Sequence, residues 1–351
     1  MSKFINDKLK TLKPYVPGEQ PTGQKYIKLN TNESPFKPSK SALKYARLEA
    51  KKSNLYSDPD AKALTKAIAL NVGVNENEVI VTNGSDEVLN FAFMAYCDSN
   101  TPAVFPDITY GFYKVFAGVN GVPKKEMPLL EDFSIDLSAF EKENGVIFIA
   151  NPNAPTGKII SLSDIERLLS VNPNRVVVID EAYVDFGGES AIPLIKKYKN
   201  LLVTRTFSKS RSMAGARLGF GVASPEIISD LQSIKYSTNP YNVNRITQAM
   251  GVGSIKDDKY FKANVSKIIS NRNYLEQNLK SLGFTFYPSS ANFVFVKHEK
   301  LNGKALYLTL KEKGILVRHF ESERISDYVR ITVGSLSEIK ALLSAIKSIL
   351  E

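Results

Sequence analysis

The sequence is short of cysteine and histidine, has no tryptophan, and has no apolar run long enough to cross a membrane. Its single cysteine, Cys97, excludes an internal disulfide framework and favours a reducing compartment. Two histidines, His298 and His319, without a Cys-x-x-Cys pair give a metal site little support, so we expect none. Residues 1–7 lack the apolar core of a signal peptide, and we expect a cytoplasmic protein with no membrane partner.

Acidic residues are fewer than basic ones, 36 against 46, which gives a net charge of +10. The lysines are spread along the chain with acidic residues between them, which is typical of a solvated surface. No helix-turn-helix segment is apparent. We therefore expect no nucleic-acid partner, although the charge favours anionic substrates weakly.

Strand and helix signals alternate through the first two thirds of the chain. The predicted strands are residues 78–81, 103–105, 146–150, 175–180, 201–206 and 218–223. Their apolar runs are continuous rather than alternating, as in parallel strands that are buried on both faces. A helix over 85–96 follows the Asn83-Gly84 turn. The pattern predicts an α/β fold with a mostly parallel sheet, of the seven-stranded type, flanked by crossover helices.

The last third predicts a smaller α/β domain. A long helical stretch, 243–282, follows Pro240 and leaves the first domain. A final helix begins at Ser335, where Glu338 completes a capping box. The predicted strands of this unit are 292–297, 315–319 and 328–332. The expected organisation is an N-terminal arm, 1–30, that packs with the small domain, a large domain, 31–240, and a small domain, 241–351.

A lysine flanked by hydroxyl groups follows the buried-looking run 201–203. Partial desolvation of Lys209 favours its uncharged amine, which can attack a carbonyl. Ser208 and Arg217, eight positions beyond the lysine, suit a bound phosphate. Most lysines are solvated surface groups. An amine beside a phosphate clamp nevertheless suggests pyridoxal 5'-phosphate (PLP) held as a Schiff base.

The run 175–180 reads as a buried strand that ends in a carboxylate, Asp180. Ligands of open α/β sheets bind at the carboxyl ends of the strands. PLP needs an anionic partner at its pyridine nitrogen, which Asp180 can supply, and Tyr183 can bond the phenolic oxygen. The alternative for Asp180 is a helix cap or a turn residue.

These motifs belong to an ordered series that resembles the fold-type I PLP-dependent aminotransferases. The series is Asn83–Glu87, Tyr110, Asn151–Gly157, Asp180–Tyr183, Ser208–Lys209, Arg217 and Arg330. Within that superfamily, Leu29–Pro35, Leu55–Pro59 and Val329–Gly334 resemble the histidinol-phosphate aminotransferase family. The resemblance spans nearly the whole chain. It implies that L-histidinol phosphate and 2-oxoglutarate react to give imidazole-acetol phosphate and L-glutamate in histidine biosynthesis, with Lys209 as the proton-transfer group.

The start of the 85–96 helix is a candidate phosphate site. Gly84, Ser85 and Asp86 open a helix whose free N–H groups and dipole favour an anion. The resemblance implies that main-chain amides bind the phosphate while the carboxylates of Asp86 and Glu87 point elsewhere. The alternative for Ser85 is a plain N-cap.

The resemblance implies further cofactor contacts. Tyr110 stacks on the pyridine ring, unless it is simply a core residue. Tyr56 reaches the phosphate in the other subunit of a homodimer with shared sites. Many relatives carry asparagine where this chain has Ala154, which cannot donate a hydrogen bond. Either Asn153 takes that place through a shifted loop, or Tyr183 holds the phenolic oxygen with less help.

At the substrate end, the resemblance implies Arg330 as the ligand of a carboxylate or phosphate and Asn32 beside it. Arg318 and Tyr15 can join Arg330, because two cations and a hydroxyl suit a doubly charged phosphate. The alternative for Arg318 is a weak surface ion pair with a neighbouring glutamate.

Three other functions share part of this evidence. An aromatic amino acid aminotransferase or a phosphothreonine-type PLP decarboxylase would carry nearly every motif above. A non-catalytic α/β ligand-binding protein is disfavoured, because no strand is followed by the GxGxxG of a dinucleotide site.

Overall fold

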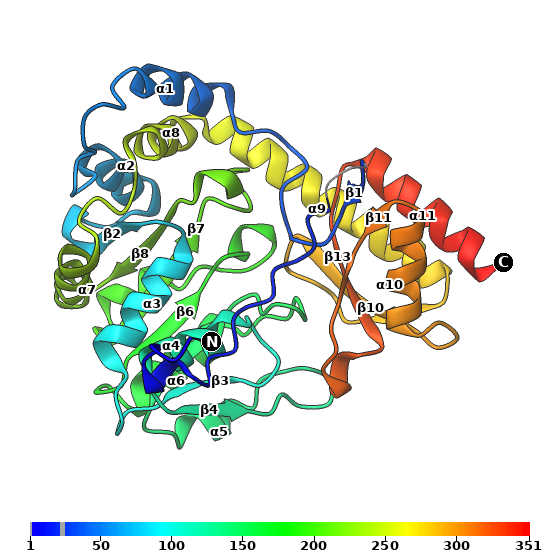
Figure 1. The fold of residues 1–351 in the computed structure, drawn as a ribbon, viewed down its shortest axis with the longest axis horizontal. Helices are drawn as coiled ribbons and strands as arrows, with labels where there is room; N and C mark the ends of the chain where they lie inside the picture. The colour runs from blue at the N-terminus through cyan, green and yellow to red at the C-terminus, as the bar shows by residue number, and fades with distance from the viewer. Residues whose placement is uncertain (1, 22–24) are drawn as a thin grey trace.

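The large part of the molecule is built on a seven-stranded sheet, seen in a computed structural model that describes residues 2–21 and 25–351 (Figure 1). The strand order is β2-β8-β7-β6-β5-β3-β4. Only β8 runs antiparallel to its neighbours; the other pairs are parallel. The strands are β2 (Val79–Thr82), β3 (Ala103–Pro106), β4 (Lys124–Met127), β5 (Val146–Ala150), β6 (Val177–Asp180), β7 (Leu201–Thr206) and β8 (Gly219–Ala223). This sheet confirms the predicted fold class.

The central strands bury both faces, as their continuous apolar runs predict. Along β6, Val177 and Ile179 join one apolar cluster, while Val178 joins another on the opposite face. This split follows from the two-residue repeat of a strand. Helices α2, α5 and α6 contribute to the first cluster, and α3, α4 and α7 contribute to the second. The edge strand β4 escaped the sequence prediction because Lys124–Met127 is largely polar, which suits a strand with one open edge.

The helices of this part lie between the strands in the chain. Their bounds are α1 (Lys40–Ala50), α2 (Lys62–Val72), α3 (Ser85–Tyr96), α4 (Phe112–Asn120), α5 (Leu137–Glu141), α6 (Leu162–Val171) and α7 (Pro225–Thr238). Helix α3 has the predicted bounds. Short 3-10 helices are η1 (Asp7–Leu9), η2 (Glu76–Glu78), η3 (Val184–Phe186), η4 (Ile192–Lys196), η5 (Ala214–Ala216) and η6 (Glu323–Ile325).

The predicted helical stretch 243–282 is divided into α8 (Arg245–Lys256) and α9 (Asp258–Ser281). The division falls at Asp257, whose backbone leaves the helical region with φ −104° and ψ 55°. Helix α8 packs on α1 and α2, whereas α9 runs from the large part to the small part (Figure 1). No helix of the described residues is long and apolar enough to span a membrane.

The small part contains a four-stranded antiparallel sheet in the order β12-β13-β10-β9. Its elements are β9 (Phe284–Phe286), β10 (Phe293–His298), β12 (Arg318–His319), β13 (Tyr328–Thr332), α10 (Gly303–Glu312) and α11 (Leu336–Leu350). The predicted strand 315–319 is two strands, β11 (Ile315–Leu316) and β12, and β11 pairs with β1 (Ile27–Lys28). Helix α11 has the predicted capping box. The division into arm, large domain and small domain at the predicted boundaries stays a prediction.

Candidate active site

A two-part cavity lies at the carboxyl ends of β5, β6 and β7. One part has a volume of about 100 Å³ and the other about 300 Å³. They share the lining residues Tyr110, Ala154, Tyr183 and Lys209. The smaller part ends at Ser208 and Arg217, and the larger ends at Arg318 and Arg330. The cavity therefore joins a phosphate-like site to a second cationic site.

Lys209 lies where the two parts meet. It follows β7 in a loop whose start is held by the Ser208 N–H, which donates to Thr206 Oγ1 at 3.0 Å. Its Nζ donates to the main-chain oxygen of Thr31 at 3.3 Å and lies 5.8 Å from the ring centre of Tyr183. The amine is thus available to a ligand in either part.

Asp180 is the last residue of β6 and is only 4% exposed. Its carboxylate accepts hydrogen bonds from the Ala182 N–H and from the Tyr113 hydroxyl, both at 3.2 Å. Burial, aided by the nearby charge of Asp86, raises the pKa of Asp180 to about 7. No cation of the described residues forms an ion pair with it. A buried carboxylate without a cation fits the protonated ring nitrogen of PLP.

The end of the cavity at Ser208 and Arg217 depends on a glycine at the start of α3. Gly84 has φ +79°, and a Cβ there would lie 2.6 Å from Nη2 of Arg217. Gly84, rather than Ser85, is the N-cap, and no side chain caps the helix. The N-terminus of α3 therefore faces Arg217 and Ser208, whose side chains lie 3.4 Å apart. Free helix N–H groups, a guanidinium and a hydroxyl suit a phosphate.

The expectation that both carboxylates at the start of α3 point away is wrong for Asp86. Asp86 lines the cavity, pairs with Arg217 at 2.9 Å and accepts from the Tyr110 hydroxyl at 2.7 Å. The reason is electrostatic, because Arg217 has no other ion-pair partner in the described chain. Glu87 does point away, since it accepts from the N–H of Asn83 and the amide of Asn242.

Tyr183 and Asn32 lie together beside the cavity. The Asn32 amide donates to the Tyr183 hydroxyl at 2.9 Å. Asn153, in contrast, does not line the cavity, whereas its neighbour Ala154 does. The Asn153 amide donates to Ile108 O and Thr156 Oγ1 and accepts from Thr109 Oγ1. Loop contacts occupy this amide, so the structure gives no shifted loop that would bring Asn153 to the place of the missing asparagine.

Arg330 lies on β13 at the far end of the cavity. Its guanidinium lies 5.3 Å from the ring centre of Phe293 and 5.7 Å from that of Phe320. Nη2 donates to Asn30 O at 3.1 Å, while the buried Nε has no partner among the described residues. Burial lowers the pKa of Arg330. An arginine with an unused buried donor is suited to an anionic ligand.

Arg318 faces Arg330 across the small sheet, where the two residues are register partners. It donates to the main-chain oxygens of Val16 at 3.2 Å and Pro17 at 3.3 Å. The surface ion pair with a glutamate is absent from the described contacts of Arg318. Tyr15, from the same arm, lines the cavity with its ring 4.3 Å from that of Phe112.

Tyr56 lies apart from this cavity, and its side chain is largely exposed. Residue exposure is 79%, and the ring stacks on Tyr241 with 4.5 Å between ring centres. Arg245 Nη2 donates to its main-chain oxygen at 2.6 Å. The structure thus brings every predicted site residue to the cavity except Tyr56, Asn153 and Gly84, the last of which lies behind Arg217.

Sequence reasoning missed Tyr113 and Phe320. Tyr113 lies in the first turn of α4, three residues beyond Tyr110, which precedes the helix, and its hydroxyl donates to Asp180. Phe320 follows the Arg318 strand, and no sequence signal separates it from other aromatic residues.

The fold and this cavity define a fold-type I PLP enzyme, since an uncompensated carboxylate, an anion site and a lysine converge. The family model for class I and II aminotransferases matches residues 24–346, so the chain belongs to that family. A histidinol-phosphate aminotransferase of Clostridium acetobutylicum is 47% identical, covering 99% of both chains.

Two solved structures share the fold. A histidinol-phosphate aminotransferase of Sinorhizobium meliloti, in complex with pyridoxal-5'-phosphate, matches with a TM-score of 0.91 and 24% identity, covering 100% of this chain and 98% of that one. An L-threonine-O-3-phosphate decarboxylase of Porphyromonas gingivalis matches with a TM-score of 0.79 and 23% identity, covering 92% and 99%. The fold alone therefore does not separate transamination from decarboxylation.

Proposed function

We propose that this protein transfers the amino group of L-histidinol phosphate to 2-oxoglutarate, which yields imidazole-acetol phosphate and L-glutamate in histidine biosynthesis. The observation that carries the proposal is the position of Lys209 between two anion-binding ends of one cavity. One end suits the phosphate of PLP, and the other suits the phosphate of the substrate. Full-length identity of 47% to a histidinol-phosphate aminotransferase supports the same substrate.

PLP supplies an electron sink that stabilises negative charge at the substrate carbon. Around it, we assign the phosphate to the main-chain amides of Ser85 and Asp86 and to the side chains of Ser208 and Arg217. Gly84 gives Arg217 room to approach the start of α3. This assignment is supported by the convergence of helix N-terminus, hydroxyl and guanidinium at one end of the cavity.

The remaining cofactor contacts orient the ring. We assign the Asp180 carboxylate to the pyridine nitrogen of PLP. The protonated nitrogen would supply the positive charge that no cation of the described chain supplies. Tyr183, oriented by Asn32, is assigned to the phenolic oxygen, and Tyr110 to the ring face. We leave Asn153 out of the cofactor site because its amide is occupied by the loop.

Lys209 moves the proton. With PLP bound, its Nζ would take the proton from the substrate carbon that bears the amino group and would deliver it to the cofactor carbon on the other side of that nitrogen. The neighbouring Thr31 oxygen, 3.3 Å away, accepts a hydrogen bond from Nζ and orients it.

Two arginines and a hydroxyl bind the substrate in this proposal. Arg330, Arg318 and Tyr15 bind the phosphate of histidinol phosphate in one half-reaction. In the other half-reaction, the same groups bind a carboxylate of 2-oxoglutarate. The proposal is supported by their common cavity and by the unused Nε of Arg330.

The deciding experiment compares substrates side by side. Purified protein with PLP and 2-oxoglutarate is given histidinol phosphate, phenylalanine, tyrosine or phosphothreonine, and glutamate and carbon dioxide are measured. We expect the highest kcat/KM for histidinol phosphate and no carbon dioxide. A preference for phenylalanine would establish the aromatic aminotransferase instead, and carbon dioxide from phosphothreonine the decarboxylase. Protein that binds no PLP would instead favour a non-catalytic ligand-binding function.

We further propose a homodimer in which each chain lends Tyr56 to the cavity of the other. The exposed ring of Tyr56, next to exposed Leu55 and stacked on Tyr241, supports a role outside its own chain. The test mixes inactive Lys209→Ala chains with Tyr56→Phe chains, after Tyr56→Phe alone is shown to be impaired. Hybrid dimers should regain activity, because one of their two sites receives both intact residues. Sedimentation that finds an active monomer would refute the dimer.

We also propose that the enzyme acts in the cytoplasm. Cys97 is a free, buried thiol whose pKa burial raises to about 12, and such a thiol suits a reducing compartment. Fractionation of cells with an antibody against the protein would test this location.

A further inference from the structure

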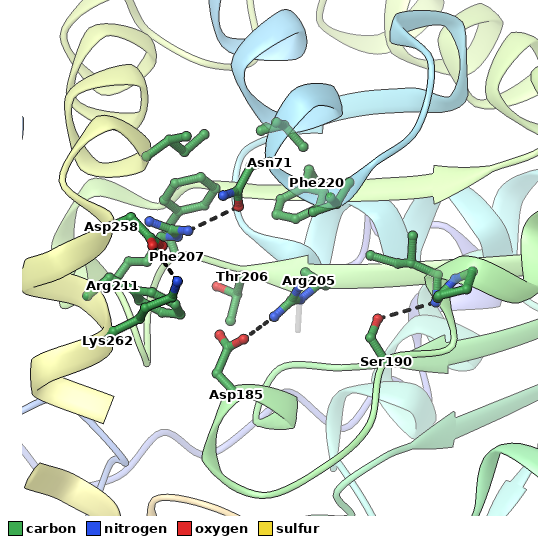
Figure 2. A pocket seen from close by; sticks show the side chains of 16 residues that line it. Asn71, Asp185, Ser190, Arg205, Thr206, Phe207, Arg211, Phe220, Asp258 and Lys262 are labelled. Atoms are coloured by element: carbon green, nitrogen blue, oxygen red, sulfur yellow. Dashed lines mark hydrogen bonds and ion pairs between the residues drawn. The ribbon is translucent and has the colours of Figure 1, made fainter. Parts of the chain in front are cut away.

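A second cavity lies behind the loop that carries Lys209. It has a volume of about 420 Å³ and is bordered by α2, the start of α9 and the segment 185–193 (Figure 2). Thr206 lines both this rear cavity and the smaller part of the active-site cavity, to which PLP is assigned and which is called the PLP cavity below. Residues 206–211 therefore run between the two cavities, although Phe207 is only 1% exposed and packs into the core.

A loop between two cavities needs specific contacts to hold it in place. The loop closes on itself, since the Met213 N–H donates to Phe207 O at 3.0 Å and the Ser212 N–H donates to Lys209 O at 3.2 Å. These bonds shape the loop but do not connect its tip to the sheet. Phe207 packs into the core, and beyond it polar side-chain contacts such as that of Ser210 hold the loop.

Ser210, the residue that follows Lys209, provides such a contact. The Ser210 hydroxyl is buried and donates to Oδ2 of Asp185. The amine of Lys209 faces the PLP cavity, whereas Asp185 lines the rear one. Adjacent side chains thus leave the loop toward opposite cavities, and fixing one of them constrains the backbone of the other.

Asp185 is itself held by an arginine of β7. Nη2 of Arg205 donates to Oδ1 of Asp185, and the two side chains face each other in Figure 2. Arg205 Nε is 3.8 Å from the buried carboxylate of Glu181, a looser contact. Glu181 accepts hydrogen bonds from the Ser190 hydroxyl at 2.7 Å and from the Ala191 N–H at 2.5 Å. The principal partner of Arg205 is therefore Asp185.

We propose that Arg205, Asp185 and Ser210 are positioning residues for Lys209. Arg205 fixes the Asp185 carboxylate, and this carboxylate fixes Ser210 through a charge-assisted hydrogen bond. The backbone of Lys209 is thereby held at one place on the cavity wall, and its amine reaches the reacting carbon at a set distance. None of the three side chains lines the PLP cavity. The proposal rests on the proposed function of Lys209.

The first test uses amide hydrogen exchange on the protein without PLP, so it does not depend on the reaction. Ser210→Ala should speed exchange in the peptide covering 207–213 by about tenfold, the effect of losing one hydrogen bond to a charged group. Ser190→Ala is the matched control, since it removes a hydroxyl-to-carboxylate bond beside the same cavity but away from the loop. It should leave exchange in 207–213 unchanged. Unchanged exchange in Ser210→Ala, or faster exchange spread evenly over the chain, would overturn the proposal.

The second test separates positioning from binding. Ser210→Ala should lower kcat about tenfold with KM for both substrates within about twofold, because the substrate-binding arginines lie on the other side of the loop. Ser210→Ala combined with Asp185→Asn should be no slower than Asp185→Asn alone, since both act through one contact. Additive losses, or a KM increase as large as the kcat loss, would contradict the proposal. If Lys209→Ala were fully active, the proposed function would fail while the exchange result remained valid.

Discussion

The two ends of the active-site cavity are built in different ways. Asp180 ends β6, Ser208 follows β7 and the start of α3 follows β2, so neighbouring strands of one sheet set their positions. At the other end, Tyr15 comes from the arm and Arg318 and Arg330 come from the small sheet. Contacts at that end join residues about 300 positions apart, such as Arg330 to Asn30 and Arg318 to Val16.

Because of this difference, we assign the reaction chemistry to the cofactor end of the cavity and substrate selectivity to the substrate end. The cofactor end presents fixed groups from the large sheet, and every substrate meets them. The substrate end depends on how the arm and small sheet meet, and its arginines divide their donors between the protein and the ligand. We therefore expect substitutions at the cofactor end to impair all substrates equally, and substitutions at the substrate end to discriminate between them.

Lys209→Ala has the largest expected effect. Without the amine, no group of the chain is placed to move the proton, and kcat should fall by at least about 10³-fold for every donor. Glutamate formation measures the loss, and an unchanged melting temperature shows that the variant folds. Lys262→Ala, an exposed lysine paired with Asp258 at 2.7 Å, is the matched control and should keep full activity. Substantial turnover by Lys209→Ala would remove the lysine from the mechanism.

Asp180→Asn should slow both half-reactions by roughly 10²–10³-fold, because a neutral amide cannot hold charge at the ring nitrogen. The loss should be the same for histidinol phosphate and phenylalanine. A loss confined to one donor would contradict the expectation that substitutions at the cofactor end impair all substrates equally. Near-normal rates would leave Asp180 with the role of a strand-end structural residue.

The same variant should be more stable than the wild type when PLP is absent. The folded protein raises the pKa of Asp180 to about 7, so the folded state binds more protons than the unfolded state between about pH 4 and 7. Stability from this group is present at low pH and is lost as the pH rises through that window. Urea unfolding should find Asp180→Asn more stable by up to a few kcal/mol at pH 8, with the difference vanishing near pH 4. A difference that does not change with pH would contradict the assigned cause.

The difference between the two ends of the cavity also determines how much of the site could be predicted from the sequence. The lysine loop, the Asp180 strand and the Gly84 turn follow from local patterns, because strand ends of one sheet necessarily meet at one edge. The direction of the Asp86 side chain could not be predicted, since it depends on Arg217, 131 residues away. Tyr113, which is buried against Asp180, and Phe320, which lines the cavity, were also missed, because in the sequence both look like ordinary core residues.

Arg330→Ala tests whether one arginine serves both half-reactions. We expect kcat/KM to fall roughly 10²-fold for histidinol phosphate and for 2-oxoglutarate, through the loss of charge-assisted hydrogen bonds to each. Arg330→Lys should recover part of the loss, because it keeps the charge but not the planar fork. Single-turnover rates of the two half-reactions measure each loss separately. A loss in only one half-reaction would assign Arg330 to a single substrate.

Arg318→Ala should distinguish between donors. A doubly charged phosphate uses a second arginine, so we expect about a tenfold loss of kcat/KM for histidinol phosphate and less than about threefold for phenylalanine. Arg318 also holds the arm, so a control must loosen the arm without touching the cavity. Lys311→Ala does so by removing the ion pair with Glu19 at 2.7 Å, and it should affect both donors alike. Equal losses on both donors in Arg318→Ala would favour the aromatic aminotransferase.

Tyr15→Phe has the smallest expected effect and isolates one hydroxyl at the substrate end. The ring keeps its contact with Phe112 at 4.3 Å, so the cavity wall remains while the hydrogen bond to the substrate phosphate is lost. We expect a roughly three- to tenfold lower kcat/KM for histidinol phosphate and no change for phenylalanine. Tyr15→Ala also removes the wall and should impair both donors. If Tyr15→Phe impaired both donors, or neither, the hydroxyl would have no part in phosphate recognition, and the arm would act only as a wall.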